Sequence, residues 1–324
     1  MQAYWMRTGA EGAMLELRET AVPQAGPGQL LVRLQAASLN RGEFLVAPGA
    51  PEASGWKQAG GEGSGLVVSA GAEVSRFKPG DRVMGRCAGA FAEYALMEEA
   101  ETLAVPDSLS PDEADSLMLT FLVAYDMLVI QGRLRPGEWL LVNGVSSGVG
   151  VASLQMAKLL GAKVIGTSGS ADKLALLQGL GLDAAIHSRA PDFAAAVLEA
   201  TAQHGADLVV NTVGGSVFAE NIRAMAFEGR LATVGHVDGV LHAELDLEAL
   251  HRRRLTLFGV SNKLRSKAQR AAALPAFEAD FMPHVAAGRL RPQIDRIFDF
   301  EHLAQAKARM EGGAHVGKIV LRMA

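Results

Sequence analysis

The stretch Leu140-Leu141-Val142-Asn143-Gly144-Val145-Ser146-Ser147-Gly148-Val149-Gly150-Val151 decides the fold. Residues 139–142 predict a buried strand, the small residues after them predict a tight turn, and residues 149–160 predict a helix. A strand, a glycine turn and a helix open a dinucleotide-binding unit, because backbone N–H groups must approach a pyrophosphate without obstruction by side chains. Such turns also occur in α/β proteins that bind no nucleotide. The turn alone therefore does not show whether this chain binds one, and the pattern of the surrounding sequence is needed.

Predicted strands and helices alternate strictly from residue 138 onward. The strands are expected at 139–142, 163–167, 184–186, 207–212, 230–234 and 255–260, and the helices between them at 149–160, 171–180, 192–203, 217–226 and 245–252. This alternation predicts an α/β fold with a parallel, doubly wound six-stranded sheet. The glycine turn follows the first of these strands, as in a Rossmann fold, and this context favours nucleotide binding.

The segments on either side of this block show different predicted secondary structure. Residues 1–115 contain short strands and glycine turns, which predict an antiparallel barrel or sandwich, with a loop at 47–57. Ser110-Pro-Asp-Glu predicts the start of a helix, and the apolar run 117–130 continues it. After residue 260, the chain predicts a helix at 266–287, a strand at 292–300, a helix at 301–310 and a final strand at 317–322. We expect these last strands to return to the first domain.

The composition excludes several classes of protein. The chain has 324 residues, 49% hydrophobic and 20% charged, with a net charge of −4, which argues against a nucleic-acid partner. No apolar run approaches the roughly 20 residues that cross a bilayer, and the N-terminus lacks the layout of a signal peptide, so we expect a cytoplasmic protein. Cys87 is the only cysteine and His187 is the first histidine, which argues against a conventional zinc site in the first half.

Short motifs along nearly the whole chain resemble the medium-chain dehydrogenase/reductase superfamily. They are Asn40-Arg-Gly-Glu43, Gly61-Glu-Gly-Ser-Gly65, Lys78-Pro-Gly-Asp-Arg-Val83, Gly89-Ala-Phe-Ala-Glu-Tyr94, Thr120-Phe-Leu-Val-Ala-Tyr125, the glycine turn and Gly317-Lys-Ile-Val-Leu321. The resemblance implies a GroES-like catalytic domain of residues 1–115 and 261–324, a Rossmann NADP-binding domain of residues 116–260, and a homodimer formed through the edge of the Rossmann sheet. The glycine turn and the Gly89 motif look most like the zinc-independent quinone oxidoreductase branch.

The differences from the zinc alcohol dehydrogenases fit that branch. Asn40 stands where those enzymes carry a metal-binding cysteine, and Gly61 stands where they carry a histidine. The lobe with four structural-zinc cysteines is absent, because residues 83–94 run almost directly into the next strand. The resemblance therefore implies an enzyme without zinc that acts on a small-molecule quinone or α,β-unsaturated carbonyl.

The second Rossmann strand bears on the choice of nicotinamide cofactor. NAD-preferring folds place a carboxylate about 20 residues past the glycines, where it binds the ribose hydroxyls. Ser168 stands there instead, and Ser170 and Lys173 follow it, so a 2′-phosphate meets hydroxyls and a cation. Ser170 also suits a helix cap and Lys173 a solvated surface, and Asp172 is a nearby acid. We expect NADPH.

Further cofactor contacts are implied by the resemblance. They are Thr120, Asn143, Ser146, Ser147, Gly148, Val149, Asn211, Val213, Gly235, His236, Phe258 and Val260. Most follow the carboxyl ends of predicted strands, where open α/β sheets bind their ligands. His236 equally suits an exposed loop residue.

Asn40, Arg41 and Glu43 are the candidates for the substrate pocket. Asn40 is expected beside the nicotinamide or substrate, or else in a turn, bonded to its own backbone. Arg41 suits an anionic substrate or the surface, and Glu43 suits a structural partner better than a general acid. Two alternatives stay open. An enoyl-thioester reductase is weakened because Leu45 replaces the tyrosine often found there. The other is a non-catalytic NADPH-binding redox sensor.

Overall fold

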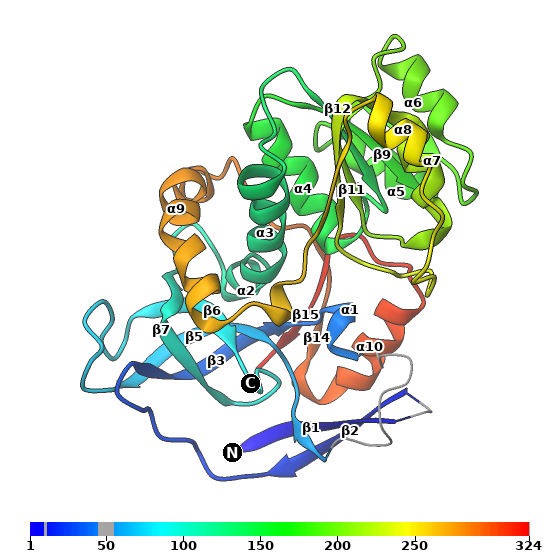
Figure 1. The fold of residues 1–324 in the computed structure, drawn as a ribbon. Coiled ribbons are helices and arrows are strands. Elements are labelled where there is room, and N and C mark those ends of the chain that lie inside the picture. The colour runs from blue at the N-terminus through cyan, green and yellow to red at the C-terminus, as the bar shows by residue number, and fades with distance from the viewer. Residues whose placement is uncertain (10–11, 45–54, 324) are drawn as a thin grey trace. The chain divides into compact units, whose positions relative to one another are not determined.

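The computed structural model describes residues 1–9, 12–44 and 55–323, drawn in colour in Figure 1. Internal contacts divide the chain into two compact units. Unit 1 comprises Met1–Leu119 and Lys267–Ala324, and unit 2 comprises Thr120–Ser266. The predicted loop 47–57 lies mostly outside the described residues. Within the described part of the chain, no helix is both long and apolar enough to cross a membrane.

Unit 2 is built on a six-stranded sheet in the order β10-β9-β8-β11-β12-β13. The strands are β8 (Trp139–Asn143), β9 (Lys163–Ser168), β10 (Ala184–His187), β11 (Ala206–Asn211), β12 (Met225–Thr233) and β13 (Thr256–Gly259), and every pairing is parallel. The crossover helices are α4 (Gly148–Leu159), α5 (Ala171–Gln178), α6 (Ala194–Ala200), α7 (Phe218–Ala224) and α8 (Leu247–Arg252). The predicted doubly wound parallel sheet is confirmed.

Burial explains why β8 is so easily recognised in the sequence. Leu140, Leu141 and Val142 are each 0% exposed in the central strand. Strands of a parallel sheet are covered on both faces, so they appear as continuous apolar runs rather than as alternating patterns.

Unit 1 contains a second six-stranded sheet, in the order β14-β15-β3-β5-β6-β7, with a further pairing of β3 with β7. Its strands are β3 (Gln29–Ser38), β5 (Glu62–Ala70), β6 (Arg82–Cys87), β7 (Tyr94–Ala104), β14 (Ile294–Asp299) and β15 (Lys318–Arg322). β15 pairs antiparallel with β3, with Val320 opposite Ser38. The C-terminal strands therefore return to the first sheet, as predicted. The helices α9 (Lys267–Ala286) and α10 (Leu303–Glu311) also belong to this unit.

Three features differ from the sequence prediction. A three-stranded sheet of β1 (Gln2–Gly9), β2 (Gly12–Glu19) and β4 (Lys57–Gln58) was not predicted. The helix expected through 110–130 is divided into α2 (Pro111–Asp115), α3 (Met118–Tyr125) and a π-helical segment, Asp126–Gln131. β12 begins at Met225, five residues before its predicted start, because Met225 is already extended (φ −72°, ψ 150°). The predicted cap is confirmed, since the Ser110 side chain accepts a hydrogen bond from the Glu113 amide.

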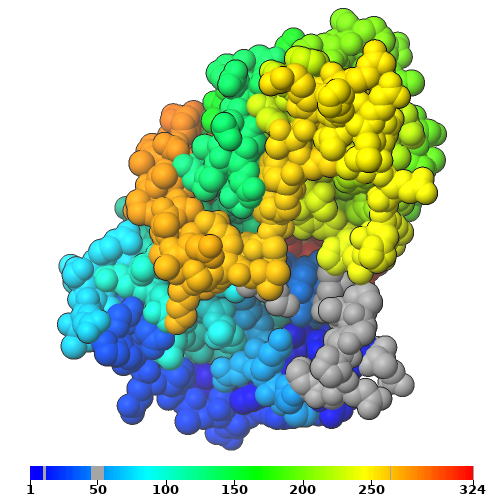
Figure 2. All heavy atoms as spheres, viewed as in Figure 1, coloured from blue at the N-terminus to red at the C-terminus, as the bar shows by residue number. Residues whose placement is uncertain are grey.

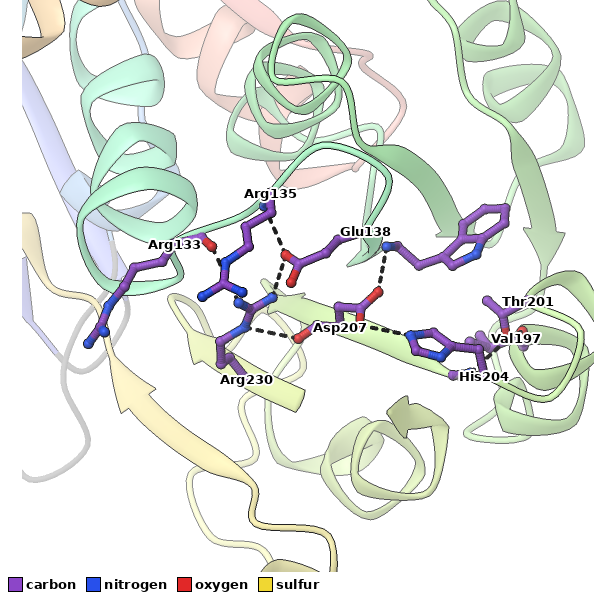
Figure 3. Close-up of polar contacts among 10 residues, drawn as sticks. Arg133, Arg135, Glu138, Val197, Thr201, His204, Asp207 and Arg230 are labelled. Atoms are coloured by element: carbon purple, nitrogen blue, oxygen red, sulfur yellow. Dashed lines mark hydrogen bonds and ion pairs between the residues drawn. The ribbon is translucent and has the colours of Figure 1, made fainter. Parts of the chain in front are cut away.

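A polar network ties together the amino ends of the central strands (Figure 3). Arg230 on β12 donates from Nη2 to Glu138 at 2.7 Å and from Nε to the carbonyl of Asp207 at 3.1 Å. The Asp207 carboxylate accepts from the Trp139 amide at 2.8 Å and lies 2.8 Å from Nε2 of His204. The network joins β8, β11 and β12 near the amino ends of β8 and β11, away from the carboxyl ends of these strands.

Candidate functional site

The carboxyl ends of five strands of unit 2, β9, β8, β11, β12 and β13, form one row of residues. Thr167 pairs with Asn143, Asn143 with Asn211, Asn211 with Thr233, and Thr233 with Gly259. Open parallel sheets bind ligands at this edge, near the point where the strand order reverses between β8 and β11. The fold therefore gathers most of the predicted cofactor residues along one edge.

Two glycines at the turn after β8 leave no room for a larger residue. Gly144 has φ +69°, and a Cβ on Gly150 would lie 2.6 Å from the carbonyl oxygens of both Gly144 and Val145. The Oγ of Ser147 accepts a hydrogen bond from the Gly150 amide at 3.0 Å, so this side chain caps α4. The remaining amides of the first helical turn, on Gly148 and Val149, have no acceptor inside a helix, and the helix dipole is positive there. The turn fits a pyrophosphate.

Asn143 carries a buried amide at the same edge. The residue is 0% exposed, and neither its Oδ1 nor its Nδ2 has a hydrogen-bond partner among the described residues. Thr212, which was not singled out in the sequence, donates from Oγ1 to the Asn143 carbonyl at 2.8 Å. Buried polar groups are normally satisfied, so an unsatisfied amide here fits a site that a ligand completes.

Asn211 uses its side chain to shape the turn after β11. Its Oδ1 accepts from the amides of Val213 and Gly214, each at 3.0 Å, and its Nδ2 donates to the Gly214 carbonyl at 2.9 Å. All three bonds are local, so the amide of Asn211 positions the backbone of the turn.

A pocket of about 370 Å³ opens beside this turn. Its walls are Asn211, Gly214, Gly215, Phe218, Thr233, Gly235, His236, Val240, Leu241, His242, Ala243 and Leu245. Three predicted cofactor residues line it: Asn211, Gly235 and His236. The loop 234–246 and α8, yellow in Figure 2, lie on the surface of unit 2, with Leu241 47% and Leu247 69% exposed.

Ser168, Ser170 and Lys173 lie together after β9. Ser168 is 8% exposed, and its Oγ accepts from the Ser170 amide at 3.3 Å. The Oγ of Ser170 accepts from the Lys173 amide at 3.5 Å and caps α5, as the sequence suggested. Asp172 is exposed in the first turn of α5. The segment offers hydroxyls and an ammonium where NAD-preferring folds carry an acid.

Thr120, Ser146, Phe258 and Val260 are the remaining predicted cofactor residues. Thr120 is buried near the start of α3, at 4% exposed. Ser146 lies in the turn before α4. Phe258 pairs with Ala232 of β12, and the Val260 amide donates to the Thr233 carbonyl at 2.9 Å.

Unit 1 contains a buried ion pair beside Asn40. The ammonium of Lys318 donates to Oδ1 of Asn40 at 2.7 Å, to Oε1 of Glu62 at 2.8 Å and to the carbonyl of Leu39 at 3.2 Å. Asn40 donates from Nδ2 to Oε1 of Glu62 at 2.8 Å and to Oε1 of Glu43 at 3.0 Å. The amide of Asn40 is thus held by partners on both sides.

Glu43 and Arg41 also have partners inside unit 1. Burial raises the pKa of Glu43 to about 7, although its hydrogen bond with Asn40 and the charge of Lys318 oppose the shift. Oε2 of Glu43 is buried and has no hydrogen-bond partner among the described residues. Arg41 donates from Nη2 to the carbonyl of Met310 at 2.7 Å. Cys87 is buried at 4% exposed, and burial raises the pKa of its thiol.

No group of three or more His, Cys, Asp or Glu side chains that could hold a metal ion occurs among the described residues. At Asn40 and Glu62, the oxygens face the fixed positive charge of Lys318. That charge would repel a divalent cation, so these residues do not fit zinc.

Two family matches and several solved structures relate the chain to known proteins. Residues 26–107 match the alcohol dehydrogenase GroES-like domain, and residues 148–277 match the zinc-binding dehydrogenase family. A solved structure described as an NAD-dependent alcohol dehydrogenase is 32% identical, with 100% of both chains covered and a TM-score of 0.86. The chain belongs to the medium-chain dehydrogenase/reductase superfamily. The predicted GroES-like and Rossmann folds are thereby confirmed.

Two other solved structures are similar over nearly the whole chain. A mycobacterial protein solved in complex with NADPH is 26% identical, covers 99% of both chains and has a TM-score of 0.88. A quinone oxidoreductase of Pseudomonas syringae pv. tomato is 28% identical, covers 99% of this chain and 100% of that one, and has a TM-score of 0.85.

Part of a much longer protein is similar as well. A polyketide synthase subunit of Mycobacterium tuberculosis is 33% identical over 90% of this chain, but the match covers 13% of that protein. The chain therefore spans about an eighth of the length of this curated relative. The solved structures that are covered over nearly their whole length include proteins described as oxidoreductases.

Proposed function

We propose that the chain is an NADPH-dependent, zinc-independent oxidoreductase that transfers hydride to a quinone or an α,β-unsaturated carbonyl. The observation that carries the cofactor choice is the segment after β9, where Ser168 and Lys173 stand in place of a carboxylate. A 2′-phosphate meets no repulsion from an acid at Ser168, and a lysine can pair with it electrostatically.

The rest of the cofactor site suits the part of the molecule that NADPH and NADH share, which is everything except the 2′-phosphate. The amides of Gly148 and Val149, in the first turn of α4, have no acceptor within the helix and suit a pyrophosphate. The pocket beside Asn211 provides further polar and apolar surface at the carboxyl ends of the same strands, and the buried amide of Asn143 lies unsatisfied beneath this end of the sheet. NADPH supplies the hydride when bound, and these residues hold and orient it.

The zinc-independent part of the proposal rests on Lys318. Its ammonium donates hydrogen bonds to the side-chain oxygens of Asn40 and Glu62. Zinc enzymes of the superfamily carry metal ligands near this position. Without a metal, a substrate that accepts hydride readily is favoured, and quinones and enones are of this kind. A proton from water completes the reduction. The relationship to the quinone oxidoreductase of P. syringae supports this substrate class.

One assay panel tests the proposal. The oxidation of NADPH and of NADH is followed at 340 nm with 1,2- and 1,4-quinones, alkenals and enoyl-CoA thioesters. We expect turnover with quinones or alkenals and a preference for NADPH. Turnover with NADH alone would overturn the cofactor choice, and loss of activity after chelation would overturn zinc independence. Activity only with enoyl-CoA thioesters would favour an enoyl-thioester reductase. Tight NADPH binding without turnover would favour a non-catalytic redox sensor.

We also propose a homodimer formed through β13. This strand ends the sheet of unit 2, and Thr256 and Gly259 on it are exposed. The unpaired backbone groups of an edge strand can pair with a strand of another chain. Light scattering should give twice the chain mass of 34.1 kDa, and a monomer would contradict the proposal.

A further inference from the structure

The loop after β10 brings an arginine beside the proposed 2′-phosphate segment. β9 and β10 are parallel, with His187 opposite Ser168. The Ser188 amide continues the ladder by donating to the Ser168 carbonyl at 3.2 Å. The next residue, Arg189, therefore lies alongside Gly169, and it donates from Nε to the Gly169 carbonyl at 3.2 Å.

Gly169 and Ser188 hold Arg189 in this position. A Cβ on residue 169 would lie 2.5 Å from Cγ of Arg189 and 2.6 Å from its Nε, so the arginine chain lies directly over the glycine. The Oγ of Ser188 donates to the Asp192 carboxylate at 2.7 Å and accepts from the Ala190 amide at 3.0 Å, which fixes the turn after Arg189.

The terminal nitrogens of Arg189 remain available to a ligand. Nε is the only atom of this guanidinium with a hydrogen-bond partner among the described residues, and the side chain is exposed. Asp192, the acid of the same turn, is engaged by Ser188. Asp172 is exposed on the first turn of α5, and Lys173 follows it.

We infer that Arg189 is a specificity-determining residue of the cofactor site, where its guanidinium pairs with the 2′-phosphate of NADPH. The inference rests on the proposed function and extends its phosphate site to a second strand. Arginine offers parallel N–H donors that match two phosphate oxygens, whereas Lys173 acts as a point charge. The Ser168 hydroxyl, which accepts from the Ser170 amide, belongs to the same segment. The same guanidinium could instead stack on the adenine ring, and that contact would not distinguish NADPH from NADH.

Binding of adenosine 2′,5′-bisphosphate and of 5′-AMP, measured by calorimetry, separates these roles without any turnover. For Arg189→Ala, we expect the Kd of the bisphosphate to rise about tenfold and the Kd of AMP to stay within about twofold. Gly169→Ala should give the same selective loss, because its Cβ displaces the arginine chain. Arg252→Ala, at a side chain that is 74% exposed on α8, is the matched control and should change neither Kd.

The outcomes distinguish this inference from the proposed function. Equal weakening of both ligands would assign Arg189 to the adenine and overturn the phosphate role, as would no change in either. If the wild-type chain bound neither ligand nor NADPH, the proposed cofactor site itself would be wrong. A selective loss in Arg189→Ala, with an unchanged melting temperature, would support the inference.

Discussion

The ammonium of Lys318 lies 2.8 Å from a carboxylate oxygen of Glu62, and their side chains are only 4% and 0% exposed. The two residues are 256 positions apart in the sequence. Both carboxylate oxygens of Glu62 also accept other hydrogen bonds. Oε1 accepts from the side chains of Ser38 and Asn40, each at 2.8 Å, and Oε2 accepts from the Leu119 amide at 2.7 Å. The C-terminal strand β15 thereby supplies the cation that neutralises a buried acid on β5.

Lys318→Met should destabilise the protein strongly, since it leaves the Glu62 carboxylate buried without its cation. Losing one partner of a buried pair costs about 3–5 kcal/mol of unfolding free energy. Lys267→Met is the control, because Lys267 pairs with Glu98 but its side chain is 70% exposed. That variant should lose less than about 1 kcal/mol. Urea unfolding of both variants gives the comparison, and equal losses would contradict the importance of the buried pair.

Glu43→Gln should change how stability depends on pH. The pKa of Glu43 is raised to about 7 by burial, against an ordinary value of 4.5. Between these pH values, the folded protein holds a proton that the unfolded chain has lost, so folding becomes less favourable as the pH rises. Glutamine keeps an oxygen that can accept from Asn40 and carries no charge. The variant should therefore gain stability relative to wild type by up to about 3 kcal/mol between pH 4.5 and pH 8.

The measurement is chemical unfolding of wild type and Glu43→Gln across that pH range. Glu248→Gln, at a side chain that is 75% exposed, serves as the control and should follow wild type. A constant difference between Glu43→Gln and wild type at all pH values would show that the carboxyl group does not titrate in this window.

The elements of unit 2 were largely predictable because the parallel strands are buried on both faces. The strand predicted at 163–167, for example, is observed as β9, Lys163–Ser168. The hairpin of β1 and β2 was missed because β2 is mostly solvated: Met14 and Leu17 are 49% and 43% exposed, so its apolar residues do not mark a core face.

The hydrogen-bond partners within the candidate sites depend on tertiary structure and could not be predicted from the sequence. Asn40 and Glu43 were singled out from a motif, but nothing local indicates that Lys318 would bond to Asn40. Arg189 is similarly 20 positions from its acceptor, Gly169, and only the register of β9 with β10 brings them together. Motif spacing thus locates candidate residues, while hydrogen-bond partners require the fold.

Gly150→Ala should damage the cofactor site directly. The added Cβ would lie 2.6 Å from the backbone carbonyl oxygens of Gly144 and Val145, and neither atom can move without opening the turn. We expect a loss of about 1–3 kcal/mol in stability and at least about a tenfold rise in the Kd of NADPH. Gly312→Ala is the control, since the nearest atom to its Cβ is at 3.4 Å. Fluorescence titration with NADPH checks the result, and unchanged affinity in Gly150→Ala would argue against this turn as the pyrophosphate site.

Arg230→Ala should reduce stability without affecting cofactor binding. Arg230 joins Glu138 and the Asp207 carbonyl at the amino ends of the strands in Figure 3, the opposite edge from the glycine turn. Its side chain is 16% exposed, so losing these bonds should cost about 1–3 kcal/mol. Arg254→Ala, whose side chain is 68% exposed and pairs with Glu228, should cost less than about 1 kcal/mol. The Kd of NADPH should stay within about twofold of wild type in both variants. If affinity fell together with stability in Arg230→Ala alone, the two edges of the sheet would be coupled, and the amino-end network would be part of the cofactor site rather than its support.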